Sequence, residues 1–454
     1  MEINKFQISN IGRFSSLEIP LAPTAEKRSN VTVFVGNNGA GKTSLLKPLA
    51  ISLSWFVARV RSEKGKGSPI AENDIKNDTP AASIKIEVKD EGSSGDGPTG
   101  MGVFEWTLAK TRRGRKSDLT SSLSTITRLA DYYRERLTNE PKFQLPLIAY
   151  YSVERGVLEI PLRIKGKHSF EQLDGYEGSL TEGVDFRRFF EWFREREDTE
   201  NEAGPPQEVF EQWLETVEEG SGAWNMLSQL QATSRDRQLM AVRSAIRTFM
   251  PGFKNLRIRR KPKLHMSIDK AGETLDVAQL SQGEKSLMAL VGDIARRLAM
   301  MNPALENPLH GDGVILIDEV DLHLHPKWQR SVIARLVQTF PNCQFVLTTH
   351  SPLVISDSKE VLCYLLDDGE LTVMDDLYGL DANQVLLKVM DTDIRNAEIN
   401  SKISDLLEKV QDGKLSEAQS LLQELGKDLP EDHIELMKAR LLIRKLELRH
   451  AQNQ

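Results

Sequence analysis

A glycine-rich loop between an apolar strand and an apolar helix constrains this sequence more than any other feature. The residues GNNGAGKTS begin at Gly36 and fit the pattern G-x-x-x-x-G-K-[ST]. They follow the β-rich run VTVFV (31–35) and precede a predicted helix from Thr43 to about Val60. In this setting loop N–H groups and the helix N-terminus face phosphates, and the lysine reaches the β- and γ-phosphates. The predicted ATP-binding residues are Asn37, Asn38, Gly39, Ala40, Gly41, Lys42, Thr43 and Ser44.

A second apolar run, GVILIDEVD (313–321), ends in acidic residues. Taken alone, such a run is often an ordinary strand end. Downstream of a phosphate loop it predicts a buried strand whose terminal Asp318 holds Mg²⁺ together with the hydroxyl of Thr43. Glu319 is then placed to activate the attacking water as a general base.

The segment LSQGEKS (280–286), called here the signature segment, predicts the start of an amphipathic helix. Ser281 fits the N-cap position, and capping and anion binding use the same unpaired N–H groups. His350 follows another buried strand, FVLTT, and a lone histidine there is more often structural than catalytic. A metal site at His323 and His325 is disfavoured, because they alternate along the chain and no cysteine is near.

The order of these segments resembles that of ABC-type ATPases, in particular the prokaryotic group of RecF and overcoming-lysogenization-defect (OLD) proteins. The resemblance covers roughly residues 1–60, 80–160 and 255–370. It implies a homodimer of heads with ATP between them, in which Ser281, Gly283 and Glu284 contact the γ-phosphate bound to the opposite subunit. It also implies that His350 is a catalytic switch residue and that Asp321 makes a cross-subunit contact.

The sequence departs from the ABC pattern at the Q-loop. The expected site follows a strand at Tyr151–Arg155, but YYSVER contains no glutamine, and Gln144 precedes the strand. Ser152 or Glu154 are the alternatives for this position. The departure makes slow or regulatory use of ATP compatible with the sequence.

The tail YGLDANQVLLKVMDTDIRNAEI (378–399), followed by helices, is similar to PtuA, the ATPase subunits of Septu anti-phage systems, which also occur beside some retrons. That resemblance implies a partner, the HNH nuclease PtuB, which acts on nucleic acid under control of the ATP-linked dimer. The sequence itself shows no His–Asn–His metal cluster.

Three rival functions remain open at this point. An OLD-type nuclease would need a Toprim domain; an SMC- or RecF-like ATPase would act on DNA without a defence nuclease; a transporter ATPase would need a membrane partner. The predicted helical insertion at residues 161–255 is too short and irregular for the long coiled-coil arm of an SMC protein. The acids that could mimic a Toprim centre are interpreted as residues of a hairpin after a strand. These are Asp367, Asp368, Asp375 and Asp376.

The pattern of strands and helices predicts an α/β fold, an ABC-type P-loop ATPase head with a mixed parallel sheet and an antiparallel subdomain. Residues 83–90 and 103–110 alternate at period two and predict a hairpin with a long tip. The predicted divisions are the N-terminal half of the head, a helical insertion, the C-terminal half, and helices that join dimers into larger oligomers or dock a partner. Their ranges are 1–160, 161–255, 256–390 and 391–454.

Net charge and cysteine content bear on nucleic-acid contact and on cellular location. The 454-residue chain has a net charge of −7, so any nucleic-acid contact must be local. Cys343 and Cys363 are too few for a disulfide framework, and the start MEINKFQISN lacks an apolar signal region, so we expect a cytoplasmic protein. Two basic runs are candidates for nucleic-acid contact, although such runs are usually solvated surface. They are Arg112, Arg113, Arg115 and Lys116, and Arg257, Arg259, Arg260, Lys261 and Lys263.

Overall fold

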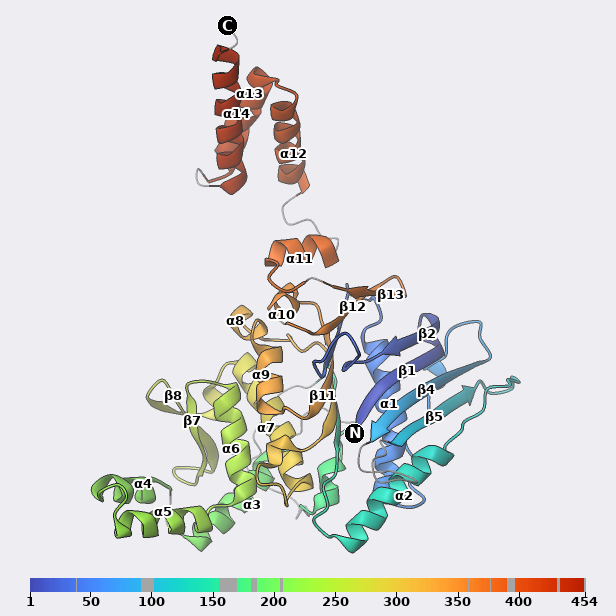
Figure 1. Cartoon of the computed structure of the whole chain (residues 1–454), viewed down its shortest axis with the longest axis vertical. Coiled ribbons are helices and arrows are strands. Elements are labelled where there is room, and N and C mark those ends of the chain that lie inside the picture. The colour runs from blue at the N-terminus through green and yellow to red at the C-terminus, as the bar shows by residue number, and fades with distance from the viewer. Residues whose placement is uncertain are drawn as a thin grey trace. The chain divides into compact units, whose positions relative to one another are not determined.

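The structure, a computed structural model, divides into two compact units, Met1–Gly379 and Leu380–Gln454 (Figure 1). In the part of the chain that it describes, none of the helices is long and apolar enough to cross a lipid bilayer. The described residues are 1–37, 39–90, 102–154, 170–180, 186–204, 207–357, 359–375, 377–389, 397–430 and 433–452.

A six-stranded mixed sheet forms the centre of the first unit. Its strand order is β13-β12-β3-β11-β10-β6, with only the β12–β13 pair antiparallel. β3, β10 and β11 are buried at every residue, as the continuous apolar runs of parallel strands predict. This confirms the predicted α/β class. The strands are β3 (Val31–Val35), β6 (Leu147–Tyr151), β10 (Gly313–Ile317), β11 (Cys343–Thr349), β12 (Leu362–Asp367) and β13 (Glu370–Met374).

The strand order brings three loops together. β11 lies between β3 and β10, and all three run parallel, so their carboxyl ends share one edge of the sheet. Ligands of open α/β sheets bind at such an edge. The phosphate loop therefore opens beside the ends of β10 and β11, although these segments are far apart in sequence.

Helices pack against this sheet and against one another (Figure 1). α1 (Thr43–Arg61) contacts β6 and β10, and α7 (Gln282–Met301) contacts β6 and is buried from Ser286 to Met301. α2 (Ser124–Asn139), which the sequence analysis does not predict, packs on α1 and β5. Three short helices lie along the later strands: α8 (Pro326–Gln329), α9 (Val332–Thr339) and α10 (Pro352–Ser356).

The antiparallel sheet has the order β2-β1-β4-β5. β4 pairs with β5 from Ala81↔Thr111 to Asp90↔Gly102, which confirms the predicted hairpin; its tip lies outside the described residues. Trp106 and Ile86 are register partners on the buried face, as period-two alternation requires. The strands are β1 (Glu2–Ile11), β2 (Phe14–Pro20), β4 (Ala81–Asp90) and β5 (Gly102–Thr111).

Helices follow one another between β6 and β7, within the range 161–255 of the predicted helical insertion. They are α3 (Phe186–Ala203), α4 (Gln207–Thr216), α5 (Gly222–Ser234) and α6 (Arg237–Phe249). α6 packs on α7 and α9, so this segment is joined to the central sheet through helix contacts. A three-stranded antiparallel sheet comes next: β7 (Phe253–Arg259), β8 (His265–Lys270) and β9 (Glu273–Asp276).

The second unit is helical and begins at Leu380, before the predicted boundary at 391. It contains α11 (Ala382–Val389), α12 (Ala397–Gln411), α13 (Leu415–Asp428) and α14 (Ile434–Gln452). Gly413, with φ +73°, separates α12 from α13, and Pro430 follows α13. Leu406, Leu425 and Leu436 come from three different helices and meet in one buried cluster.

Candidate nucleotide site

The phosphate loop connects β3 to α1 and turns sharply on its glycines. Gly39 has φ +78° and Gly41 has φ +105°, conformations that side-chain-bearing residues rarely adopt. Gly36 lies so close to β12 that an added Cβ would be 2.4 Å from the carbonyl oxygen of Leu366. Asn38 lies outside the described residues. The glycine pattern therefore reflects backbone geometry that the loop requires.

Lys42 is buried inside this loop. Its Nζ donates to the carbonyl oxygens of Gly36 at 2.8 Å and Asn37 at 3.1 Å, and lies 3.2 Å from Nδ1 of His350. Burial lowers the pKa of Lys42 to about 8, although nearby carboxylates, Glu319 first among them, act in the opposite direction. An anionic group in the loop would favour the charged form of this lysine.

Thr43 and Asp318 come together at the start of α1 and the end of β10. Thr43 Oγ1 donates to Asp318 Oδ2 at 2.6 Å, while the other carboxylate oxygen accepts a short hydrogen bond from Thr348 Oγ1. Asp318 is fully buried and Thr43 is exposed, so the pair lies at the border of the core and the loop. A hydroxyl and a carboxylate are oxygen ligands of the kind Mg²⁺ takes in nucleotide sites.

Glu319 and His350 face each other at the ends of β10 and β11. Glu319 Oε1 lies 3.5 Å from His350 Nε2. The Glu319 backbone has φ +47°, in the left-handed region, and its N–H donates to Thr348 Oγ1 at 2.7 Å. Left-handed backbone at a non-glycine residue concentrates at functional sites. The structure thus brings Lys42, His350 and Glu319 into one contiguous group.

Asp321 is engaged within its own chain. Its Oδ1 accepts hydrogen bonds from Thr349 Oγ1 and, at 3.3 Å, from the backbone N–H of His350. Asp321 thereby positions the loop that carries His350. His325 caps α8, because its Nδ1 accepts from the N–H of Lys327 at 3.2 Å. Among the described residues, no group of three or more His, Cys, Asp or Glu side chains could hold a metal ion.

The signature segment forms the first turn of α7. Ser281 and Glu284 make a reciprocal capping box: Ser281 Oγ accepts from the N–H of Glu284, and Glu284 Oε2 accepts from the N–H of Ser281 at 3.1 Å. The predicted N-cap role of Ser281 is confirmed. Lys270 also donates to Glu284 at 2.8 Å. An added Cβ at Gly283 would be 2.3 Å from the carbonyl oxygen of His323, so this position requires glycine.

The signature segment opens into a pocket separate from the phosphate loop. Its volume is about 580 Å³, and Ser281, Glu284, His323 and Trp328 are among its lining residues. None of the described residues of the phosphate loop lines it. Thr43 and Ser44 instead line a different pocket of about 280 Å³ with Gly12, beside α1 and β1.

The predicted Q-loop region starts at the same edge of the sheet. The Tyr151 carbonyl oxygen accepts from the N–H of Asp318 at 2.8 Å, so residues that follow β6 begin next to the end of β10. Ser152 and Glu154 are described, while Arg155 lies outside the described residues. Beneath this edge the Tyr151 hydroxyl donates to Asp293 at 2.9 Å.

Arg13 is a residue of this site that sequence reasoning missed. Its Nη1 donates to the carbonyl oxygens of Gly39 and Ala40 at 3.1 Å, and its Nη2 pairs with Asp368 at 3.0 Å. Asp368 and Gly369 form the two-residue turn between β12 and β13, with φ +40° and +86°. This confirms the hairpin interpretation for Asp367 and Asp368; Asp375 follows β13, and Asp376 lies outside the described residues. No local motif marks Arg13, because its partners are distant in sequence.

Sequence comparison matches most of the chain to a known family. The model described as "AAA domain, putative AbiEii toxin, Type IV TA system" matches residues 31–356. The retron Vc95 probable ATPase of Vibrio cholerae serotype O1 biovar El Tor is 33% identical over 380 residues, 78% of this chain and 72% of that protein. The retron Ec83 probable ATPase of Escherichia coli is 32% identical over 406 residues, 82% of this chain and 72% of that protein.

Shorter and structural similarities complete the comparison. The Septu protein PtuA of Bacillus mycoides is 38% identical over 95 residues, 21% of this chain and 12% of that protein. An SMC head bound to the C-winged helix domain of ScpA covers 82% of this chain and 97% of its own, with a TM-score of 0.43 and 15% identity. The chain belongs to the family described as "AAA domain, putative AbiEii toxin, Type IV TA system", and it is an ATPase of the retron and PtuA-like defence type.

Proposed function

We propose that ATP and Mg²⁺ bind between the phosphate loop of one chain and the signature segment of a second copy. The hydrogen bond between Thr43 and Asp318, next to Lys42, carries this proposal. The Thr43 hydroxyl and the Asp318 carboxylate would together hold the magnesium ion, which would neutralise charge on the phosphates. On binding, the Lys42 ammonium would move from the backbone carbonyls of Gly36 and Asn37 to phosphate oxygens.

The proposed catalytic residues lie beside this site. Glu319 would orient and deprotonate the attacking water, and His350 would contact the γ-phosphate while Asp321 holds its loop. Arg13 supports the phosphate loop from its outer side through the carbonyls of Gly39 and Ala40. Each of these groups lies at the carboxyl edge of the central sheet.

A second copy is needed because the signature segment opens into its own pocket. Ser281 is the N-cap of α7, and Ser281, Gly283 and Glu284 line that pocket, where the N-terminus of the helix would favour an anion. The phosphate loop of the same chain does not line it. Two chains placed head to head would bring the two halves of each site together.

Mixing two inactive variants tests the two-chain site. Lys42→Ala removes the phosphate-loop cation, and Ser281→Arg blocks the signature pocket, so each variant alone should lose ATP turnover. A mixed dimer contains one intact composite site, formed by the loop of the Ser281→Arg chain and the signature segment of the Lys42→Ala chain. Turnover measured after mixing should therefore recover.

Two results would contradict the two-chain site. One is full turnover by Ser281→Arg alone. The other is a mixture that forms heterodimers, shown by native mass spectrometry of tagged chains, yet stays inactive. Intact ATP binding by Lys42→Ala would contradict the phosphate-loop assignment itself.

We further propose that the ATP-linked dimer controls a partner HNH nuclease in an anti-phage complex in the cytoplasm. The similarity to the Septu protein PtuA and to retron ATPases supports this. In the second unit, Ile434, Leu441 and Leu448 repeat every seven residues along α14 and are exposed, so residues 391–454 offer an apolar helix face for joining heads or docking a partner.

Co-expression with a PtuB-like HNH nuclease tests the partner. A tagged chain should retain the nuclease, and cleavage of a plasmid should change between ATP and no nucleotide. Deleting residues 391–454 separates the two steps, because the remaining head contains the whole phosphate site. If neither the full chain nor the head retains the nuclease, the partner proposal fails while the ATP site stands.

A further inference from the structure

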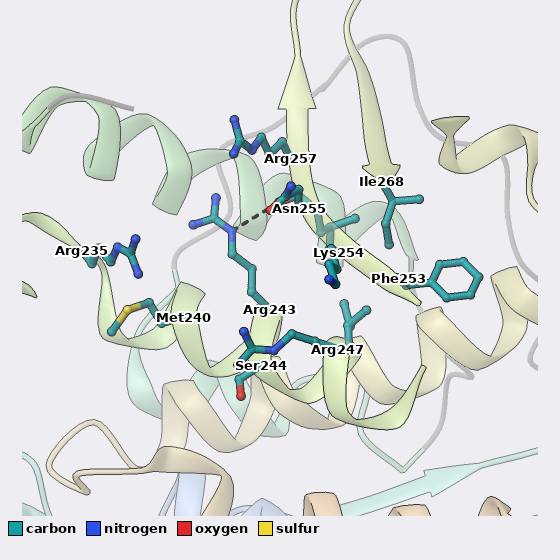
Figure 2. A pocket seen from close by; sticks show the side chains of 12 residues that line it. Arg235, Met240, Arg243, Ser244, Arg247, Phe253, Lys254, Asn255, Arg257 and Ile268 are labelled. Atoms are coloured by element: carbon teal, nitrogen blue, oxygen red, sulfur yellow. Dashed lines mark hydrogen bonds between the residues drawn. The ribbon is translucent and has the colours of Figure 1, made fainter. Parts of the chain in front are cut away.

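A basic pocket lies away from the nucleotide site, between α6 and the sheet that begins with β7 (Figure 2). Its volume is about 530 Å³. Five of its lining residues are cationic and none is acidic; the rest are apolar or neutral polar. The cations are Arg235, Arg243, Arg247, Lys254 and Arg257.

Positive charge is concentrated around this pocket, although the whole chain is negatively charged. Residues 235–270 contain eleven Lys and Arg against two Asp, while the chain as a whole carries a net charge of −7. Arg259 and Lys263 extend the basic surface along the β7–β8 hairpin. A positive surface on a negative protein attracts polyanions to one place.

Arg243 is fixed by acidic neighbours. It pairs with Glu197 at 2.8 Å and Glu200 at 2.7 Å, its guanidinium lies over the ring of Phe193, and its Nε donates to the carbonyl oxygen of Leu256 at 3.3 Å. These contacts neutralise Arg243 and hold it at the wall of the pocket. Figure 2 shows the guanidinium groups of Arg235, Arg243 and Arg257 around one open space.

Arg247 and Lys254 are different. Both are exposed, Arg247 in the last turn of α6 and Lys254 on β7, and neither forms an ion pair with a residue that the structure describes. Their charges are therefore not neutralised by any ion pair within the described part of the chain. Two such cations on opposing elements of a concave surface are suited to oxygens of a phosphodiester.

We propose that this pocket binds the phosphate backbone of a single-stranded nucleic acid. The volume suits a nucleotide of one flexible strand, within the range of pockets that enclose their ligands. A duplex carries its phosphates on a convex surface and would touch only the rim. The site lies outside the nucleotide pocket, so it adds direct nucleic-acid contact to the proposed ATP-dependent role.

The test is fluorescence anisotropy with a labelled twenty-nucleotide single strand and the full-length chain. Arg247→Glu with Lys254→Glu reverses the two unpaired charges. We expect at least about a tenfold rise in Kd and a salt-dependence slope lower by about 0.7 for each lost phosphate contact. The matched control is Arg115→Glu with Lys116→Glu, which changes charge equally in the other basic run, where both residues are exposed.

The control should keep nearly wild-type affinity, and both double variants should bind ATP as the wild type does. Equal weakening by both variants would overturn the pocket assignment, and so would no weakening by either. A wild-type chain that does not bind the strand would also overturn it. Tighter binding of a duplex of equal length, or complete displacement by pyrophosphate at equal phosphate concentration, would overturn the single-strand specificity.

Discussion

Thr43 Oγ1 donates a 2.6 Å hydrogen bond to Asp318 Oδ2, which joins the first residue of α1 to the residue after β10. The two residues are 275 positions apart in sequence. Since β11 separates their strands, only the loops at the sheet edge bring them within contact. A magnesium ion bound to both would replace this hydrogen bond.

Asp318→Asn should therefore remove the magnesium-dependent part of ATP binding. The amide keeps the shape of the buried side chain but loses the charge that a divalent cation requires. We expect ATP affinity in Mg²⁺ to fall by about ten- to a hundredfold, toward the value measured in EDTA. Titration calorimetry with and without Mg²⁺ measures both values.

Asp312→Asn is the matched control, because Asp312 immediately precedes β10, at the opposite end of the strand, and is 59% exposed. It should leave the difference between Mg²⁺ and EDTA unchanged. An Asp318→Asn chain that still shows the full magnesium effect would mean that this carboxylate does not hold the ion.

Lys42 predicts a pH dependence of ATP binding. Its pKa is lowered by burial to about 8, and phosphate oxygens would raise it on binding. Below pH 8 the lysine is charged before and after binding, so no proton is taken up. Above pH 8 binding must add a proton, and affinity should fall by up to tenfold for each pH unit.

Calorimetry at pH 9 in buffers of different ionisation enthalpy measures that proton uptake directly. Lys42→Arg keeps a charge throughout this range, since arginine stays protonated, and is the control for other titrating groups. Uptake that persists in Lys42→Arg would assign the effect to a different group.

Glu319→Gln should retain ATP binding and lose turnover. The amide cannot accept a proton from water, and general-base catalysis contributes about a hundredfold or more to rate. Glu360→Gln is the control, because Glu360 also has a positive φ, at +63°, but is exposed and is not a residue of the nucleotide site. Phosphate release measured at saturating ATP separates the two variants, and unchanged turnover in Glu319→Gln would exclude this residue as the base.

The parts of the site that could be predicted are those written in consecutive residues. The sequence predicts residues 36–44 and Asp318–Glu319, because each set lies in one turn or at one strand end, and its members are consecutive in sequence. Arg13 could not be predicted, because its partners come from other elements and only the folded sheet joins them. The contact of Asp293 with Tyr151 could not be predicted for the same reason, whereas Arg296 and Arg297 lie on its own helix. α2 was also missed: its apolar positions, Ile126, Leu129 and Tyr133, are few among charged residues.

Gly283→Ala should separate nucleotide binding from turnover. The new Cβ would meet the His323 carbonyl oxygen at 2.3 Å, and relief must shift backbone on one side. Overpacking of this kind costs about 1–3 kcal/mol. We expect ATP binding by the single chain to remain and turnover to fall, since the signature segment moves.

Gly426→Ala is the control for a glycine-to-alanine change in a helix, because nothing lies within 4 Å of its added Cβ. It should keep turnover and not lower thermal stability. Full turnover by Gly283→Ala would show that the signature segment tolerates displacement and is not part of the active dimer.

Asp293 tests how the core supports the site. It pairs at 2.7 Å with both Arg296 and Arg297 and accepts from the Tyr151 hydroxyl, all within the core. Burial alone would raise the pKa of Asp293, but the two guanidinium groups lower it to about 2. Asp293→Asn leaves two buried cations without their counterion, which should cost about 3–5 kcal/mol of unfolding free energy.

The lowered pKa sets the direction of the pH effect. The carboxylate stabilises the fold above its unfolded pKa near 4, and this contribution is lost as pH falls toward 2. Urea unfolding at pH 7 and pH 3 should show that the difference in unfolding free energy between wild type and Asp293→Asn narrows as pH falls.

Asp131→Asn is the control, because it breaks an equally spaced pair with Arg134 at the surface and should cost at most about 1 kcal/mol. Similar losses of unfolding free energy in Asp293→Asn and Asp131→Asn would mean that burial does not strengthen the ion pairs of Asp293.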